Sequence, residues 1–144
     1  MRPPTPRSKI GIPGLDHILN EGLLPNRLYL VEGDPGAGKT TLGLHFLIEG
    51  ARIGEKCLYV ALSETKEELA AGAASHGWTL DGIEILELIA SEKDLLADAH
   101  VTMYNPSELE LGETTESVLE AFRRIEPHRV VFDSLSELRL LAQG

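Results

Sequence analysis

Short apolar runs alternate with amphipathic segments along most of this 144-residue chain. Runs rich in Val, Ile, Leu, Tyr and Phe predict β-strands at residues 28–32, 57–62, 83–88 and 129–133. Their near-continuous apolar character is typical of strands that are buried on both faces of a parallel sheet.

The segments between these runs predict helices. Residues 40–53 place apolar side chains at helical spacing, and residues 66–76 are rich in Ala and Glu and stop at a glycine. Residues 115–125 carry apolar side chains on one face and stop before a proline, and a short apolar helix is expected within residues 11–26. The alternation indicates an α/β fold with a mainly parallel sheet flanked by helices, in which ligands bind at the carboxyl ends of the strands.

Length and composition favour one domain. At 42% hydrophobic residues the chain can bury one core and is too short for two ordinary domains. Three prolines among the first six residues predict a flexible arm over residues 1–8, and the ordered domain then covers 9–144. Since no strand is expected after residue 133, we expect this domain to be partial, with its sheet incomplete at the C-terminus.

Charge and cysteine usage exclude several classes of protein. The formal net charge is -10, and the first ten residues are basic, so the body is strongly acidic and a general nucleic-acid surface is disfavoured. The single cysteine, Cys57, excludes an intrachain disulfide and fits a reducing compartment. Without a long apolar stretch or a signal-peptide pattern, we expect a cytoplasmic protein that makes no membrane contact.

A glycine-rich loop follows the first predicted strand and precedes the first long predicted helix. The stretch "VEGDPGAGKTTL" fills the pattern G-x-x-x-x-G-K-[ST] of the Walker A phosphate-binding loop. Glycines allow consecutive N–H groups to form a nest for an anion, and the helix dipole that follows favours phosphate. The candidate nucleotide-binding residues are Gly33, Asp34, Pro35, Gly36, Ala37, Gly38, Lys39, Thr40 and Thr41.

Three polar residues of this region have distinct expected roles. Lys39 would place its charge between the β- and γ-phosphates, and the Thr40 hydroxyl would ligate the magnesium ion that bridges them. Thr41 could bond the α-phosphate. Asp133, at the end of the last predicted strand, is the candidate second magnesium residue, although an aspartate there could also cap the next segment.

Hydrolysis also needs a group that orients or deprotonates the attacking water, and Glu64 is the best placed. It follows the strand predicted at 57–62, so it would lie at the same edge of the sheet as the phosphates. The alternative is a first-turn helix acid, with Ser63 as the cap of the helix at 66–76.

The remaining distinctive side chains predict packing rather than chemistry. The five histidines lack the paired spacing of a metal site and are expected at the surface or in packing roles: His17, His45, His76, His100 and His128. Trp78 is expected to pack the preceding helix onto the sheet, with stacking on an adenine as the alternative.

Four stretches taken together carry a family resemblance. "GIPGLDHIL", "RLYLVEGDPGAGKTTLGLHFL", "YVALSETKEEL" and "RVVFDSLSELRLL" occur in order, and the chain resembles the KaiC-like branch of the RecA superfamily of ATPases. The resemblance implies a RecA-like P-loop NTPase core that binds ATP and Mg²⁺. It assigns the phosphates to residues 33–41, magnesium to Thr40 and Asp133, and catalysis to Glu64 and Lys39.

The resemblance also carries expectations about assembly. Family members form rings, hexamers among them, with ATP between subunits, so a homo-oligomer with protein signalling partners is expected. The neighbouring subunit usually supplies a basic residue from a later part of the domain. KaiC itself has two adjacent glutamates after this strand, whereas this chain has Ser63 and then Glu64.

Four functions remain open at this point. The first is an ATPase that couples nucleotide hydrolysis to oligomer or conformational switching in signalling. The second is a Ser/Thr autokinase, in which a protein hydroxyl replaces water as the phosphoryl acceptor. The third is a DNA-binding recombination-type ATPase, which the acidic body disfavours. The fourth is a nucleotide-sensing scaffold without turnover.

Overall fold

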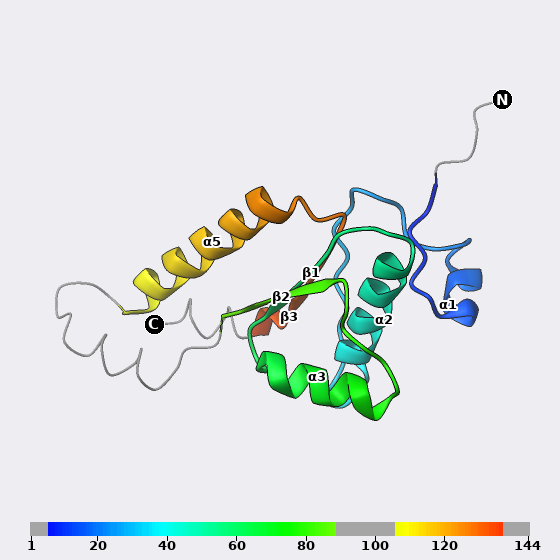
Figure 1. The fold of residues 1–144 in the computed structure, drawn as a ribbon, viewed down its shortest axis with the longest axis horizontal. Coiled ribbons are helices and arrows are strands. Elements are labelled where there is room, and N and C mark those ends of the chain that lie inside the picture. Colours follow the sequence, from blue (N-terminus) through cyan, green and yellow to red (C-terminus); the bar gives the residue numbers. More distant parts are fainter. Residues whose placement is uncertain (1–5, 89–105, 137–144) are drawn as a thin grey trace.

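A computed structural model describes residues 6–88 and 106–136 (Figure 1). Helices and strands alternate through most of this part. They are α1 (Pro13–Ile18), α2 (Lys39–Arg52), β1 (Cys57–Ala61), α3 (Lys66–Ser75), β2 (Ile83–Glu87), α5 (Pro106–Ile125) and β3 (Arg129–Asp133). The predicted α/β class is confirmed, and α5 begins well before the predicted start of that helix at residue 115.

The described strands form a parallel sheet in the order β2-β1-β3. β1 lies in the middle, and its first residue, Cys57, is in register with Arg129 of β3. Its last residue, Ala61, is in register with Asp133. Because the strands are parallel and aligned, the residues that follow β1 and β3 lie at one edge of the sheet.

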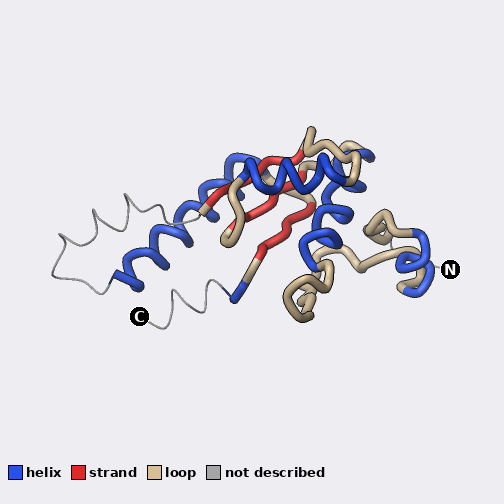
Figure 2. Tube along the Cα trace, turned by 90° about the horizontal axis from the view of Figure 1, so that it is seen from below, coloured by secondary structure: helices blue, strands red, loops and turns tan. Residues whose placement is uncertain are grey.

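Helices cover both faces of this sheet, as Figures 1 and 2 show. The side chains of β1 alternate between the two faces, as in any strand. Cys57, Tyr59 and Ala61 pack with α2 and α3, and Leu58 and Val60 pack with α5. All five are almost fully buried, which explains why the strand is apolar at every position.

Helix α2 lies with its backbone close against β3, because two of its contact positions are glycines. A Cβ atom at Gly43 would lie 3.1 Å from Cγ1 of Val131, and one at Gly50 would lie 2.5 Å from Cδ of Arg129. The helix therefore runs antiparallel to β3. Its first turn lies beside Asp133, and its later turns lie beside Arg129.

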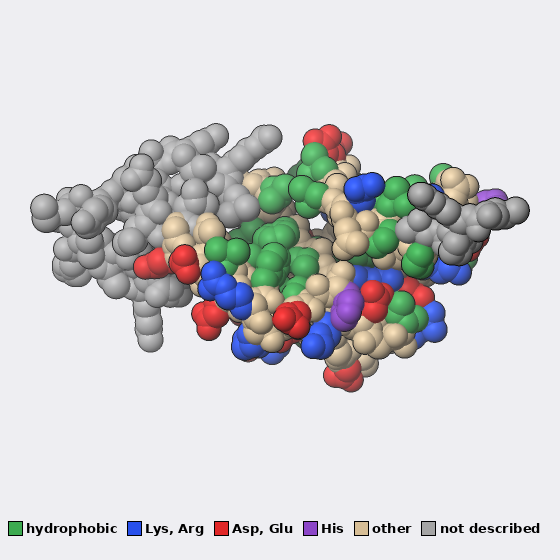
Figure 3. Space-filling model, turned by 90° about the horizontal axis from the view of Figure 1, so that it is seen from above, with side chains coloured by type: hydrophobic (Ala, Val, Ile, Leu, Met, Phe, Trp, Pro, Cys, Tyr) green, Lys and Arg blue, Asp and Glu red, His purple; other side chains and the backbone are tan. Residues whose placement is uncertain are grey.

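The predicted strand at 28–32 is wrong. These residues are not part of the described sheet, in which β1 pairs with β2 and β3. Leu28 is 95% exposed and Leu30 is 66% exposed, and hydrophobic side chains are visible at the surface in Figure 3. An apolar run becomes a strand only where its backbone finds a ladder partner, and here this segment makes no ladder with β3.

The N-terminal segment is held together by hydrogen bonds within residues 8–23. Ser8 and Leu23 exchange N–H···O bonds of 2.7 and 2.8 Å. The buried carboxylate of Asp16 accepts bonds from the N–H groups of Ile10 and Gly11, at 2.8 and 3.0 Å. Residues 1–5 of the expected arm lie outside the described residues, so the division into an arm and a domain stays a prediction.

Trp78 packs against the core cluster on the α2 and α3 face of the sheet, as predicted. Its ring is stacked on His76 and meets the edge of His45. Within the described residues, none of the helices is both long enough and apolar enough to cross a membrane.

Candidate functional site

The glycine-rich loop lies exposed immediately before α2. Gly36 and Gly38 have φ values of 84° and 100°, which residues with a Cβ rarely adopt. Open space surrounds both positions, so it is the backbone conformation that requires glycine there. The ammonium group of Lys39 donates to the carbonyl oxygen of Gly33 at 2.5 Å, which places a positive charge at the loop.

The two predicted magnesium residues are in direct contact. The Thr40 hydroxyl donates a hydrogen bond of 2.6 Å to Oδ2 of Asp133, across 93 positions of the sequence. The contact forms because the first turn of α2 lies against the carboxyl end of β3. A hydroxyl and a carboxylate, the oxygen ligands that magnesium prefers, thus converge beside the phosphate loop.

A third side chain in this cluster was missed by sequence reasoning. The Tyr59 hydroxyl donates a hydrogen bond to the same Oδ2 atom of Asp133. Burial, and secondly the hydrogen bond to Asp133, hold the pKa of the Tyr59 phenol above its ordinary value, so it stays a neutral donor. Its position inside an apolar strand resembles that of a core residue, and only the polar tip of tyrosine could have pointed to the site.

Glu64 lies after the end of β1, at the same edge of the sheet as Asp133. It is half-buried, and this burial raises the pKa of its carboxyl group above the ordinary value. The negative charges of Asp133 and Glu68 raise that pKa further. The environment of Glu64 therefore makes it a stronger base than an exposed glutamate.

The alternative in which Ser63 caps the helix and Glu64 is an acid of its first turn is wrong. The N-cap of α3 is Thr65, whose hydroxyl oxygen accepts a 3.1 Å bond from the N–H of Glu68. Ser63 instead donates to the main-chain oxygen of Asp133 at 3.4 Å. Glu64 precedes the cap, so it is not a first-turn acid of the helix, and its catalytic role stays a prediction.

The residues at this edge fit a nucleotide and its magnesium ion. The loop supplies a glycine nest and a lysine, and Thr40 and Asp133 supply two oxygen ligands. No group of three or more His, Cys, Asp or Glu side chains suited to a metal occurs in the part of the chain that the structure describes. Magnesium commonly takes one or two protein ligands and completes its shell with phosphate and water, so the oxygens of Thr40 and Asp133 fit it.

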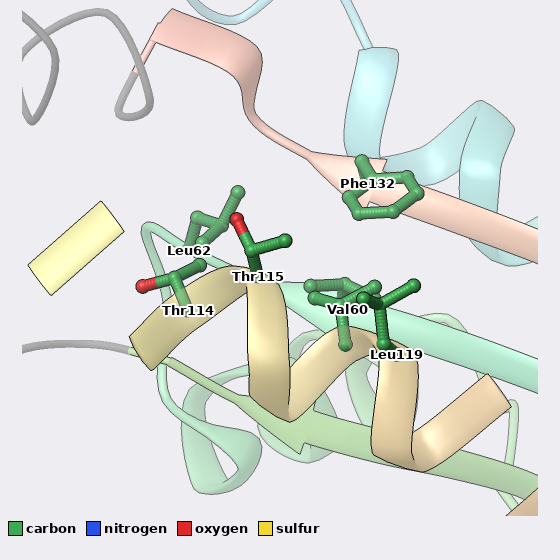
Figure 4. Close-up of a pocket in the computed structure, with 7 residues that line it drawn as sticks. Val60, Leu62, Thr114, Thr115, Leu119 and Phe132 are labelled. Atoms are coloured by element: carbon green, nitrogen blue, oxygen red, sulfur yellow. The ribbon is translucent and has the colours of Figure 1, made fainter. Parts of the chain in front are cut away.

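An apolar hollow of about 150 Å³ lies on the other face of the sheet (Figure 4). Its lining comes from Val60 and Leu62 of the β1 region, Phe132 of β3, and Thr114, Thr115, Val118 and Leu119 of α5. Val60 and Tyr59 point to opposite faces of the sheet. The sheet therefore separates this hollow from the hydrogen-bonded side chains of Thr40, Tyr59 and Asp133. The described residues that line the hollow are apolar side chains and two threonines.

Comparison with known proteins decides the family. The family model described as "ATPase: KaiC" matches residues 8–143. The chain belongs to the KaiC ATPase family. The resemblance and the RecA-like P-loop fold are thereby confirmed, and the Walker A loop, Glu64 and Asp133 all lie inside the matched region.

Several curated proteins are similar in sequence to this chain. A UPF0273 protein of Pyrococcus horikoshii is 34% identical over 139 residues, which cover 93% of this chain and 56% of that protein. A UPF0273 protein of Thermotoga maritima is 31% identical over 92% of this chain and 57% of its own length. The circadian clock protein KaiC2 of Synechocystis is 34% identical over 89% of this chain and 22% of its own length. The chain thus spans a little over half the length of the UPF0273 proteins.

Proposed function

We propose that this KaiC-type domain binds MgATP on residues 33–41 and hydrolyses it with Glu64 as the residue that orients or deprotonates water. The hydrogen bond between Thr40 and Asp133 carries the proposal. It joins the start of α2, directly after the phosphate loop, to the carboxyl end of β3. The candidate phosphate and magnesium residues therefore lie together at one edge of the sheet. A glycine-rich turn without a nucleotide would have no need of a carboxylate at that point.

Each residue has a role that its surroundings support. Lys39 stabilises negative charge on the transferred phosphoryl group, and the loop N–H groups hold the phosphates. Thr40 and Asp133 would hold the magnesium ion, which supplies charge neutralisation on the phosphate oxygens when it is bound. Glu64 accepts a proton from water or aligns the water. Its pKa is raised toward neutral pH, which makes it a better proton acceptor.

The biological role that we propose is oligomer or conformational switching in signalling, driven by the nucleotide state. The support is family membership together with the relative named as a circadian clock protein. A ring-shaped homo-oligomer and a cytoplasmic location belong to the same proposal. The formal net charge of -10 disfavours the DNA-binding alternative.

The test follows γ-labelled MgATP in the full-length protein and measures label in free phosphate and in protein. Lys39→Ala should abolish nucleotide binding, and Glu64→Gln should keep binding while hydrolysis falls by about 100-fold or more. Lys56→Ala and Glu67→Gln are matched controls, since both residues are exposed, Lys56 at the amino edge of the sheet and Glu67 on α3. Both controls should hydrolyse ATP normally.

Other outcomes would identify the alternatives. Label retained on Ser or Thr would indicate the autokinase, and tight binding without turnover would indicate the nucleotide-sensing scaffold. Undiminished hydrolysis by Glu64→Gln would remove Glu64 from the mechanism.

A further inference from the structure

One carboxylate oxygen at the site accepts hydrogen bonds from two hydroxyl groups. Oδ2 of Asp133 receives the hydrogen bonds of both Thr40 and Tyr59. The two donors differ in their surroundings, because Thr40 is a half-buried residue of the helix that follows the phosphate loop, whereas Tyr59 is 1% exposed and belongs to the central strand. Only Thr40 has a role in the proposed magnesium site.

The position of the Tyr59 hydroxyl is set by the core. Its ring packs in the cluster that includes Leu44 and Leu47 of α2 and Leu69 of α3. On β3 its register partner is Val131, two residues before Asp133. A side chain held in this way keeps its hydroxyl in one place, as an exposed polar residue could not.

The Asp133 carboxylate needs such an anchor for two reasons. The torsion that turns a carboxylate is soft, so a single hydrogen bond leaves it able to rotate. Glu64, at the same edge of the sheet, carries a charge of the same sign, and the repulsion between the two acids favours movement of Asp133 away from the site. Two donors on one oxygen limit that movement.

We propose that Tyr59 is a positioning residue: its hydroxyl fixes Oδ2 of Asp133, so that the carboxylate keeps the orientation in which it serves magnesium together with Thr40. This inference rests on the proposed function of the same site. Thr40 can donate its proton to Asp133 and offer a lone pair to a cation at the same time. Tyr59, enclosed in the core, donates its hydroxyl hydrogen to Asp133 and has the Thr40 hydroxyl beside it.

Tyr59→Phe tests the role, because it removes the hydroxyl and keeps the ring. In the full-length protein, binding of a fluorescent ATP analogue is measured first with EDTA and then across a MgCl₂ titration. Affinity in EDTA should stay within about twofold of wild type, because the loop and Lys39 are intact. The MgCl₂ concentration at half-maximal response should rise about tenfold, as expected when one hydrogen bond to a charged group is lost.

Tyr29→Phe is the matched control. The Tyr29 hydroxyl is bonded to main-chain atoms of Leu24, and its loss should leave the MgCl₂ midpoint unchanged. A wild-type midpoint in Tyr59→Phe would overturn the proposal. So would an equal loss of affinity in EDTA and in MgCl₂ accompanied by a lower melting temperature, because that pattern describes a purely structural tyrosine.

Lys39→Ala separates this inference from the proposed function. If Lys39→Ala binds the ATP analogue as wild type does, the nucleotide site itself is wrong and the inference falls with it. If Lys39→Ala loses binding while Tyr59→Phe keeps the wild-type midpoint, the nucleotide site stands and only the role of Tyr59 is overturned.

Discussion

The two ends of β3 carry opposite charges, and the two charges differ in their burial and in their partners. At the amino end, Arg129 is 2% exposed and is surrounded by protein groups. Its guanidinium pairs with Glu55 at 2.9 Å, donates to the carbonyl oxygens of Lys9 and Phe46 at 2.5 and 2.8 Å, and lies 4.7 Å from the centre of the Phe46 ring. The charge of Arg129 is thus compensated by a carboxylate, two carbonyl oxygens and an aromatic ring of the same chain.

At the carboxyl end, Asp133 is only half-buried and its partners are hydroxyl groups. Among the described residues, neither Asp133 nor Glu64 forms an ion pair with a cationic side chain. The ammonium of Lys39 is bonded to Gly33 instead. The charge at the Arg129 end is thus compensated within the chain, whereas the acids at the Asp133 end are the ones for which we propose a role with magnesium.

Arg129→Met should produce the largest effect on folding. The substitution keeps most of the side-chain volume but leaves the Glu55 carboxylate and two carbonyl oxygens without their donor. Breaking a buried pair in this way costs about 3–5 kcal/mol of unfolding free energy, measured by urea denaturation. In the exposed pair of Arg124 and Glu84, Arg124→Ala should cost less than about 1 kcal/mol. Equal losses for the two substitutions would contradict a structural role for Arg129.

Asp133→Asn should have little effect on folding stability and a large effect on ATP hydrolysis. The amide keeps the shape and can still accept the bonds of Thr40 and Tyr59, so the free energy of unfolding should change by less than about 1 kcal/mol. The charge that would serve magnesium is lost, and ATP hydrolysis should fall by about 100-fold. A loss of stability as large as that of Arg129→Met would mean that both ends of β3 are structural.

Much of this arrangement follows from local sequence patterns. The strands at 57–61, 83–87 and 129–133 and the helix after the phosphate loop were predicted, because an apolar run or a helical period marks each of them. Thr40 and Asp133 could be paired in advance because parallel strands end at one edge of a sheet.

The misses share a physical cause, which is dependence on distant partners. Residues 28–32 are as apolar as the true strands, but strand formation depends on a ladder partner that local composition does not reveal. Tyr59 resembles a core residue until the register of β1 with β3 places its hydroxyl at Asp133. The partners that enclose Arg129 are likewise distant in sequence, since Glu55 and Phe46 lie 74 and 83 positions before it.

Gly50→Ala should give an intermediate effect on stability and tests the contact between α2 and the Arg129 end. Alanine normally stabilises a helix interior relative to glycine. Here its Cβ would lie 2.5 Å from Cδ of Arg129 and 2.8 Å from the sulfur of Cys57, so a loss of about 1–3 kcal/mol is expected. Gly72 of α3 has open space, and Gly72→Ala should instead add about 0.5–1 kcal/mol. Thermal denaturation of both variants decides whether the contact is as close as described.

The smallest expected effect concerns the folding stability of Glu64→Gln and its dependence on pH. Burial, Asp133 and Glu68 raise the pKa of Glu64 above its ordinary value of 4.5, so the folded state disfavours ionised Glu64 more than the unfolded state does. Well below pH 4.5 both proteins are neutral at this position in the folded and the unfolded state, and they should be about equally stable.

As the pH rises through the raised pKa, wild type loses stability that Glu64→Gln keeps, so urea denaturation should find the variant slightly more stable at neutral pH. The control, Glu67→Gln, removes an acid from the first turn of α3, where the helix dipole favours it, and should lower stability slightly at neutral pH. A Glu64→Gln protein less stable than wild type at neutral pH would show that Glu64 is a structural acid. The carboxyl end of the sheet would then resemble the Arg129 end, because its charges would serve the fold and not the nucleotide.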